Sequence, residues 1–396
     1  MDRTDIHNSK RNLKRIIFRL QNSSISAKNK KLIMDFHDDC VSSGLSTNRI
    51  LFYMQKLFRI ISLLNKDLDK ATKDDIRRIV QEIELNENYT EWTKNNYKVT
   101  LKKFYKWLDR GEDYPDKVKW IRATVKKDRT KIIEVLSEED VKQLIDAAKG
   151  VRNKALISAL YESGCRIGEL MNLRIGDLTF DDYGAVIQVN GKTGPRRVRL
   201  VSSVPRLAVW VEHHPVKSPE SPLWVNVGTT NHDQAMGYQT VCKMLKDVAA
   251  NIGLKKPVNP HAFRHARATH LASKLTEAQM NEYLGWIQGS KMPATYVHLS
   301  GKNIDDAILR MNGVIPKEPD ESQTFRLKKC PRCLHENPPD SHFCTRCRLP
   351  LDEKTAIEIE QRKKEFISTT ITNEIIEKMV EEKVRLILAE KSSANS

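Results

Sequence analysis

The chain has 396 residues, of which 39% are hydrophobic and 30% are charged, and its formal net charge is +16. This composition indicates a soluble protein with hydrophobic cores, and the length predicts two or three domains. The sequence has no apolar run of the ~18 residues that a membrane span needs, and its polar start shows no secretory signal. The excess positive charge favours nucleic acid as the partner, because it attracts polyanions, and a merely basic soluble protein is the alternative.

The first part of the chain is predicted to be helical. Residues 1–21 form a basic, polar segment with a short helix near its end, and further helices are expected over residues 22–112. Thr72 is the expected N-cap of one of these helices, and residues 90–108 form another amphipathic helix. Residues 113–135 are rich in charge and predict a linker. Apolar residues recur at the three- and four-residue steps of a helix in Ile50, Met54, Leu57, Ile61 and Leu64.

A second, mainly helical domain is predicted over residues 136–312. Ser137 precedes three acidic residues, which is typical of a helix N-terminus. Residues 185–201 alternate between apolar and polar side chains around a Gly-Lys-Thr-Gly turn, and this alternation predicts a β-hairpin. Residues 313–328 predict a second linker. The expected fold class is therefore mainly α with a small β-hairpin or sheet.

Two arginines in separate motifs are suited to holding a phosphate group. Arg166 follows Gly164 in the run GCRIGEL, and Glu169 comes three positions later. Arg264 belongs to the run HAFRH, which begins at His261, so this histidine and arginine share one face of a helix. A planar guanidinium can bind two phosphate oxygens at once. Taken singly, these residues have plainer interpretations, namely a surface ion pair for Arg166 and a helix-surface carboxylate for Glu169.

Two aromatic residues follow these motifs. Trp286 comes after Leu-Gly, and Tyr296 stands in the run TYVHL. An indole N–H can donate a hydrogen bond to a phosphate but cannot shuttle a proton, and a plain core tryptophan is the alternative. A phenol with a pKa of about 10 is a poor nucleophile at neutral pH. We therefore expect Arg166, Arg264 and a nearby lysine to favour the phenolate of Tyr296.

In their order and local context, these residues resemble the motifs of the tyrosine recombinase (phage integrase) family, in particular its archaeal and Xer-like members. The resemblance extends over residues 22–312. It implies a helical core-binding domain of the SAM-like type over residues 22–112 and a catalytic domain over residues 136–312. It also implies a supporting role for Glu169 and catalytic roles for Arg166, Lys192, His261, Arg264, Trp286 and Tyr296.

The resemblance implies a role for the hairpin as well. Lys192, in the turn, would protonate the leaving 5′-oxygen, although turn lysines are usually only solvated. Arg196 and Arg197 lie next to it and compete with it for DNA contact. His265 and His270 are expected to be structural.

The same resemblance implies the chemistry. Tyr296 would form a 3′-phosphotyrosine, which conserves the bond energy, so strand cleavage would need neither ATP nor a metal. The implied protein is a site-specific DNA recombinase or integrase that acts on double-stranded DNA, as a homo-tetramer on two sites, in the cytoplasm and associated with the nucleoid. The alternatives are a type IB topoisomerase-like enzyme, a non-catalytic DNA-binding regulator built on the same fold, and a zinc-dependent nucleic-acid adaptor.

Four of the seven cysteines form a compact module near the end of the chain. Their spacing, C-x2-C-x10-C-x2-C, predicts a zinc ribbon over residues 329–351, in which four thiolates bind a structural Zn²⁺ and leave no position open for chemistry. The ligands are Cys330, Cys333, Cys344 and Cys347. The other cysteines are scattered, which favours a reducing, intracellular compartment. Residues 352–396 predict a C-terminal amphipathic helix and tail, which either pairs with another subunit or folds onto its own chain.

Overall fold

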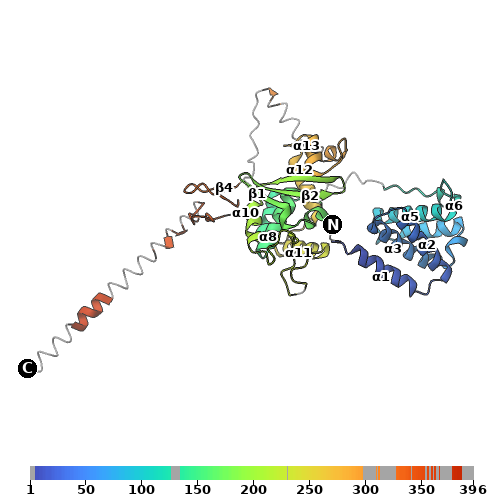
Figure 1. The fold of residues 1–396 in the computed structure, drawn as a ribbon, viewed down its shortest axis with the longest axis horizontal. Helices are drawn as coiled ribbons and strands as arrows, with labels where there is room; N and C mark the ends of the chain where they lie inside the picture. The colour runs from blue at the N-terminus through green and yellow to red at the C-terminus, as the bar shows by residue number, and fades with distance from the viewer. Residues whose placement is uncertain are drawn as a thin grey trace, which may run out of the picture. The chain divides into compact units, whose positions relative to one another are not determined.

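The computed structural model describes residues 5–125, 134–229, 231–297, 327–339 and 341–352, together with residues 309, 311–312, 355, 358–359, 361–362, 365 and 377–385. The chain divides into two compact units, Met1–Glu134 with Gly228–Lys243, and Val135–Val227 with Met244–Ser396. No helix within the described residues is both long and apolar enough to cross a membrane. Figure 1 shows the helices of the first unit and the helices and strands of the second.

The first unit is a helical bundle around one hydrophobic core. Its elements are α1 (Ser9–Gln21), α2 (Ala27–Ser42), α3 (Thr47–Leu64), the short 3-10 helix η1 (Leu68–Lys70), α4 (Lys73–Leu85), α5 (Glu91–Asp109) and α6 (Asp116–Lys119). Phe36 on α2 packs edge-to-face against Phe104 and Trp107 of α5, with ring centroids 5.4 and 5.2 Å apart. The predicted cap at Thr72 is confirmed, because its side chain and that of Asp75 form a reciprocal capping box at the start of α4.

Both ends of this bundle extend beyond the expected limits. Ile16 and Leu20 of α1 are buried in the common core, so Ser9–Gln21, within the basic N-terminal segment, is a helix of the bundle and not part of a separate segment. Val118 and Ile121 are buried in the same core, although the sequence placed them in the linker. Burying these apolar side chains in the core is more favourable in free energy than leaving them exposed to water in a linker.

The second unit combines helices with a three-stranded sheet. Its helical elements are α7 (Glu138–Ala147), α8 (Val151–Ser163), α9 (Ile167–Met171), the 3-10 helix η2 (Ile175–Asp177), α10 (Val204–Glu212), the part of α11 (Tyr238–Asn251) that begins at Met244, α12 (Pro260–Leu271), α13 (Glu277–Leu284) and α14 (Met292–Val297). The predicted cap at Ser137 is confirmed by a capping box with Asp140. The central helix is α8, which is buried from Ala155 to its end and packs against α7, α10 and α12. Figure 1 labels α8 together with α10 and α12.

The sheet is antiparallel and has the order β1-β2-β3, with β1 at Leu178–Asp181, β2 at Gly184–Gly191 and β3 at Gly194–Leu200. The predicted hairpin is confirmed, since Gly191 pairs with Gly194 across a two-residue turn formed by Lys192 and Thr193. Strand β1, which pairs with β2, was not predicted. Its four residues show a single buried position, which is too short a pattern to read as a strand.

The last part of the chain contains a small cysteine module. Strands β4 (Lys328–Lys329) and β5 (Glu336–Asn337) form a two-stranded antiparallel sheet. The preceding linker, residues 313–326, lies outside the described residues. Residues 377–385 are helical, and Val380 and Val384 on this helix are 56% and 49% exposed. Apolar residues at steps of four, four and three, namely Ile376, Val380, Val384 and Ile387, are the basis for predicting an amphipathic helix here, and Ile376 and Ile387 lie outside the described residues.

Candidate active site

The first candidate arginine, Arg166, lies where the chain turns between α8 and α9. Gly164 ends α8 with a φ of +55°, and a Cβ at this position would lie 2.8 Å from Leu284 Cδ2. The turn places Arg166 at the N-cap of α9. Its Nη1 donates to Glu169 Oε1 at 3.0 Å, and its Nη2 donates to Gly285 O at 3.0 Å. The side chain remains 36% exposed, so its guanidinium is held from two sides and still faces solvent.

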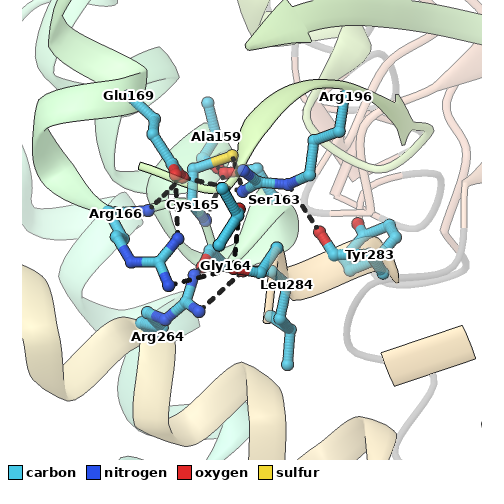
Figure 2. Close-up of polar contacts among 12 residues, drawn as sticks. Ala159, Ser163, Gly164, Cys165, Arg166, Glu169, Arg196, Arg264, Tyr283 and Leu284 are labelled. Carbon is cyan, nitrogen blue, oxygen red and sulfur yellow. Dashed lines mark hydrogen bonds and ion pairs between the residues drawn. The ribbon is translucent and has the colours of Figure 1, made fainter. Parts of the chain in front are cut away.

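Glu169 joins two arginines inside the second unit. Its side chain is only 4% exposed, and its carboxylate pairs with Arg166 and, at 2.7 Å, with Arg196 Nη2 (Figure 2). Burial alone would raise the pKa of Glu169, but the hydrogen bonds and charges of Arg196 and Arg166 lower it. The interpretation as a helix-surface carboxylate is therefore wrong.

Arg196 is the residue of this cluster that the sequence analysis did not assign correctly. Its side chain is 8% exposed, and its Nε donates to Tyr283 O at 3.1 Å, so it does not compete with Lys192 for DNA (Figure 2). The signal was present in the sequence. Arg196 shares the two-residue period of Val198 and Leu200, which are fully buried, so it lies on the inner face of β3.

Two glycines allow this cluster to form. Gly285 has a φ of +63°, and a Cβ there would lie 2.5 Å from Arg196 Nη1. A Cβ at Gly191 would collide with Glu169 Oε1. Thr193 Oγ1 also donates to Gly285 O at 3.2 Å, so the hairpin turn is attached to the loop that follows α13. The adjacent Lys192 is exposed on this turn.

The second candidate arginine, Arg264, lies in the first turns of α12. Asn259 caps this helix by accepting hydrogen bonds from the backbone N–H groups of the next residues, and Pro260 occupies its first position. Arg264 is buried, with Nη1 and Nη2 each 2.7 Å from a backbone carbonyl oxygen, those of Gly164 and Leu284 (Figure 2). Burial and the charge of Arg166 lower the pKa of Arg264 to about 10.

His261 and His265 lie one turn apart on α12, with ring centroids 4.4 Å apart. His261 is exposed, and its pKa is lowered by partial burial and by the charges of Arg264 and Arg166. His265 was expected to be structural, yet its Nδ1 lies 2.6 Å from the phenol oxygen of Tyr296. Sequence reasoning missed this contact because it depends on how α14 packs against α12.

Tyr296 is buried on α14, with 3% of its surface exposed. Its ring stacks on Trp286, with centroids 5.6 Å apart and planes inclined by 11°, and Arg264 Cζ lies 5.5 Å from the centre of the Trp286 ring. Burial raises the pKa of Tyr296, and the charge of Arg264 opposes this only in part. The expectation that nearby cations favour the phenolate is therefore wrong for the protein without DNA, because desolvation is the larger effect.

The four clustered cysteines converge as their spacing predicts. Their Sγ atoms all lie within 4.8 Å of one another, which allows them to hold a metal ion. Two sulfur pairs, Cys330 with Cys347 and Cys333 with Cys344, are 3.5 Å apart. Four sulfurs at ~2.3 Å from a central ion would be roughly 3.8 Å apart, so the cluster needs little adjustment to bind one.

The chain is similar to proteins that rearrange DNA. Residues 134–303 match the phage integrase family. A tyrosine recombinase from Thermosipho africanus is 26% identical over 275 residues, which cover 67% of this chain and 94% of the relative. The XerH site-specific recombinase in a post-cleavage complex with its palindromic difH substrate is 18% identical, with a TM-score of 0.54 and coverage of 78% of this chain and 97% of that one. A lambda integrase tetramer bound to a Holliday junction is 16% identical, with a TM-score of 0.53 and coverage of 68% and 80%.

Proposed function

We propose that this chain, a tyrosine-type site-specific recombinase, cuts and rejoins duplex DNA by attack of Tyr296 on a backbone phosphate. The observation that carries this assignment is the convergence of three separate segments around the loop after α13. Arg166 binds the carbonyl of Gly285 in this loop, Arg264 binds the carbonyl of Leu284 at its start, and Tyr296 stacks on Trp286. A phosphate bound here would face two fixed cations and a phenol.

The two arginines would bind the scissile phosphate and stabilise the negative charge that builds up as the nucleophile attacks. Both guanidinium groups are already fixed by backbone carbonyls and, for Arg166, by Glu169. Groups held in this way need little rearrangement during the reaction, and a fixed donor at a developing oxyanion is typically worth ~3–4 kcal/mol. Glu169 and Arg196 act through Arg166 and the hairpin, so they are positioning residues.

Proton transfer would be divided between separate groups. Lys192 on the hairpin turn would protonate the leaving 5′-oxygen, because an arginine is too basic for this task. His261 is exposed one turn before Arg264 and would donate a hydrogen bond to the phosphate. The indole N–H of Trp286 can do the same but cannot transfer a proton. The resulting 3′-phosphotyrosine retains the bond energy, so rejoining needs no ATP.

The wider assembly is inferred from the relatives. We infer double-stranded DNA as the substrate and a homo-tetramer on two sites as the active form. The lambda integrase structure, a tetramer bound to a Holliday junction, supports the tetramer. We further infer that residues 22–112 bind the core site, that the protein is cytoplasmic and associated with the nucleoid, and that it is of the archaeal type within the family. For the cysteine module, we infer a structural Zn²⁺ in a zinc ribbon, since four thiolates are a preferred zinc ligand set.

The test is a nicked duplex that traps the covalent intermediate. Wild-type protein should form a denaturant-stable adduct at a defined position, and Tyr296→Phe should bind the same DNA without forming one. An adduct in Tyr296→Phe would identify another nucleophile. Relaxation of DNA without site preference would favour a type IB topoisomerase, and specific binding without any adduct would favour a regulator.

A further inference from the structure

We propose that His265 is the general base that accepts the phenol proton of Tyr296 and returns it when the strands are rejoined. The inference rests on the proposed function, in which Tyr296 is the nucleophile, and adds a proton acceptor that the family motifs found in the sequence leave unassigned. It concerns a residue that the sequence analysis expected to be structural.

The geometry of the two side chains supports a direct transfer. The phenol oxygen of Tyr296 and Nδ1 of His265 are 2.6 Å apart, within the distance over which a general base accepts a proton. The two rings are inclined by 41°, with centroids 5.6 Å apart. The indole of Trp286 stacks on the phenol ring, and it offers no hydrogen-bond acceptor to the hydroxyl. The phenol proton therefore has an acceptor before any DNA is present.

The surroundings of His265 favour its neutral form. Burial lowers the pKa of His265 below the ordinary value of 6.5, and the neighbouring His261 and Arg264 on the same helix lower it further. From α14, the titratable group that faces it is Tyr296 itself. A neutral ring with its proton on Nε2 presents Nδ1 as an acceptor, which is the state a base requires.

The proton and the bonds balance in this scheme. In cleavage, the phenol O–H bond breaks as Nδ1 of His265 takes the proton, the phenol oxygen bonds to phosphorus, and the phosphorus–5′-oxygen bond breaks as Lys192 supplies a proton. In rejoining, the 5′-hydroxyl gives its proton back to the neutral Lys192 as its oxygen bonds to phosphorus, the bond between phosphorus and the phenol oxygen breaks, and the leaving phenolate regains its proton from His265. The cationic His265 beside Arg264 is a stronger acid than free histidine, which favours this return step.

The chain offers a matched control on the same helix. His270 Nδ1 lies 2.8 Å from the phenol oxygen of Tyr161. Among the described side-chain hydrogen bonds, none joins this pair to the side chains of the arginine cluster, which consists of Arg166, Glu169, Arg196 and Arg264. His270→Asn removes an imidazole from a histidine–tyrosine pair, as His265→Asn does. A loss of stability caused by removing an imidazole should therefore appear in both variants. A loss of the proton acceptor should slow adduct formation in His265→Asn alone.

The experiment measures single-turnover adduct formation on the nicked duplex between about pH 5 and about pH 9. His265→Asn retains a hydrogen-bond acceptor but cannot take the proton, so its rate at neutral pH should fall by about 10²–10⁴-fold. The wild-type rate should fall on acidification with a midpoint below 6.5, and this acid limb should be absent from His265→Asn. DNA affinity should be unchanged in both variants, and His270→Asn should keep the wild-type rate and pH profile.

A second measurement separates a base from a structural residue. Replacing Tyr296 by a difluorotyrosine, whose phenol is more acidic, should restore much of the lost rate in His265→Asn, because a phenol that ionises by itself needs no base. A His265→Asn rate within about threefold of wild type with the same acid limb, or no rescue by the acidic phenol, would overturn the role of His265. Adduct formation by Tyr296→Phe would instead overturn the proposed function, so the two failures are distinguishable.

Discussion

The arginine cluster and the nucleophile are held in different ways. Arg166, Glu169, Arg196 and Arg264 are linked to one another and to the backbone by several hydrogen bonds, and three of the four side chains are nearly buried. Within the described part of the chain, the side chain of Tyr296 is held by a hydrogen bond to His265 and by its stacking on Trp286. In the proposed mechanism the cluster is thus preorganised for a phosphate, whereas the nucleophile stays protonated until a base removes its proton.

The largest effect is expected from removing an arginine. Arg166→Ala and Arg264→Ala should each lower single-turnover cleavage by at least about two orders of magnitude, because each removes a fixed charge at the developing oxyanion. Arg264→Ala should also lower stability, because it leaves two buried carbonyls without a donor. Arg174→Ala, which loses only a surface pair with Glu220, is the control and should cleave normally. Wild-type cleavage by Arg166→Ala would refute the phosphate assignment.

Lys192 belongs neither to the arginine cluster nor to the contacts that hold Tyr296, and it is exposed on the hairpin turn. Lys192→Ala should lower cleavage of ordinary DNA by about 10²-fold or more, as expected for the loss of a general acid. A 5′-phosphorothiolate substrate, whose leaving group needs no proton, should restore the rate. A variant that is not rescued would move the acid role to another residue, with His261 the first candidate.

The pH dependence of stability tests the ion pairs that Glu169 makes with Arg166 and Arg196. Its folded-state pKa is lowered, so its contribution to stability is present above the unfolded value of about 4.5 and is lost as the pH falls through the lower folded-state pKa. Glu169→Gln should destabilise the catalytic unit by about 3–5 kcal/mol at neutral pH, since it leaves the buried Arg196 without its partner. Urea unfolding at several pH values measures this, and the loss should shrink below about pH 4. An equal loss at all pH values would contradict the ion-pair account.

The smallest effect on cleavage is expected from the cysteine module. Metal analysis should find about one zinc per chain, and Cys344→Ser should unfold the module while adduct formation on a short core site stays near the wild-type rate. Assembly on longer DNA should suffer instead. Protein that contains no zinc would refute the metal site, and loss of adduct formation in Cys344→Ser would show that the module is part of the cleavage machinery.

The sequence predicted the elements whose signals are local. The caps at Thr72 and Ser137 and the hairpin turn at Lys192 depend on neighbouring residues, and the structure confirms them. Arg166 and Arg264 were recognised from short motifs, but what each one binds was not predicted, because Gly285 and Leu284 lie far away in the chain.

Two misassigned residues show where the local signal ends. Arg196 lies on the inner face of β3. Its ion pair with Glu169 is visible only in the folded chain, because the two residues come from separate elements. The contact of His265 with Tyr296 depends on the packing of α14 against α12, which no spacing in the sequence encodes. Burial likewise reversed the expected direction of the pKa of Tyr296, because desolvation is a property of the folded chain.

The central claim is tested most directly by identifying the residue that becomes linked to DNA. Wild-type protein would be trapped on a nicked duplex and digested, and the peptide that carries the nucleotide would be sequenced by mass spectrometry. The account predicts a single phosphotyrosine at Tyr296, joined to the 3′ side of the cut. A nucleotide on any other residue, or a 5′-phosphotyrosine linkage, would contradict it.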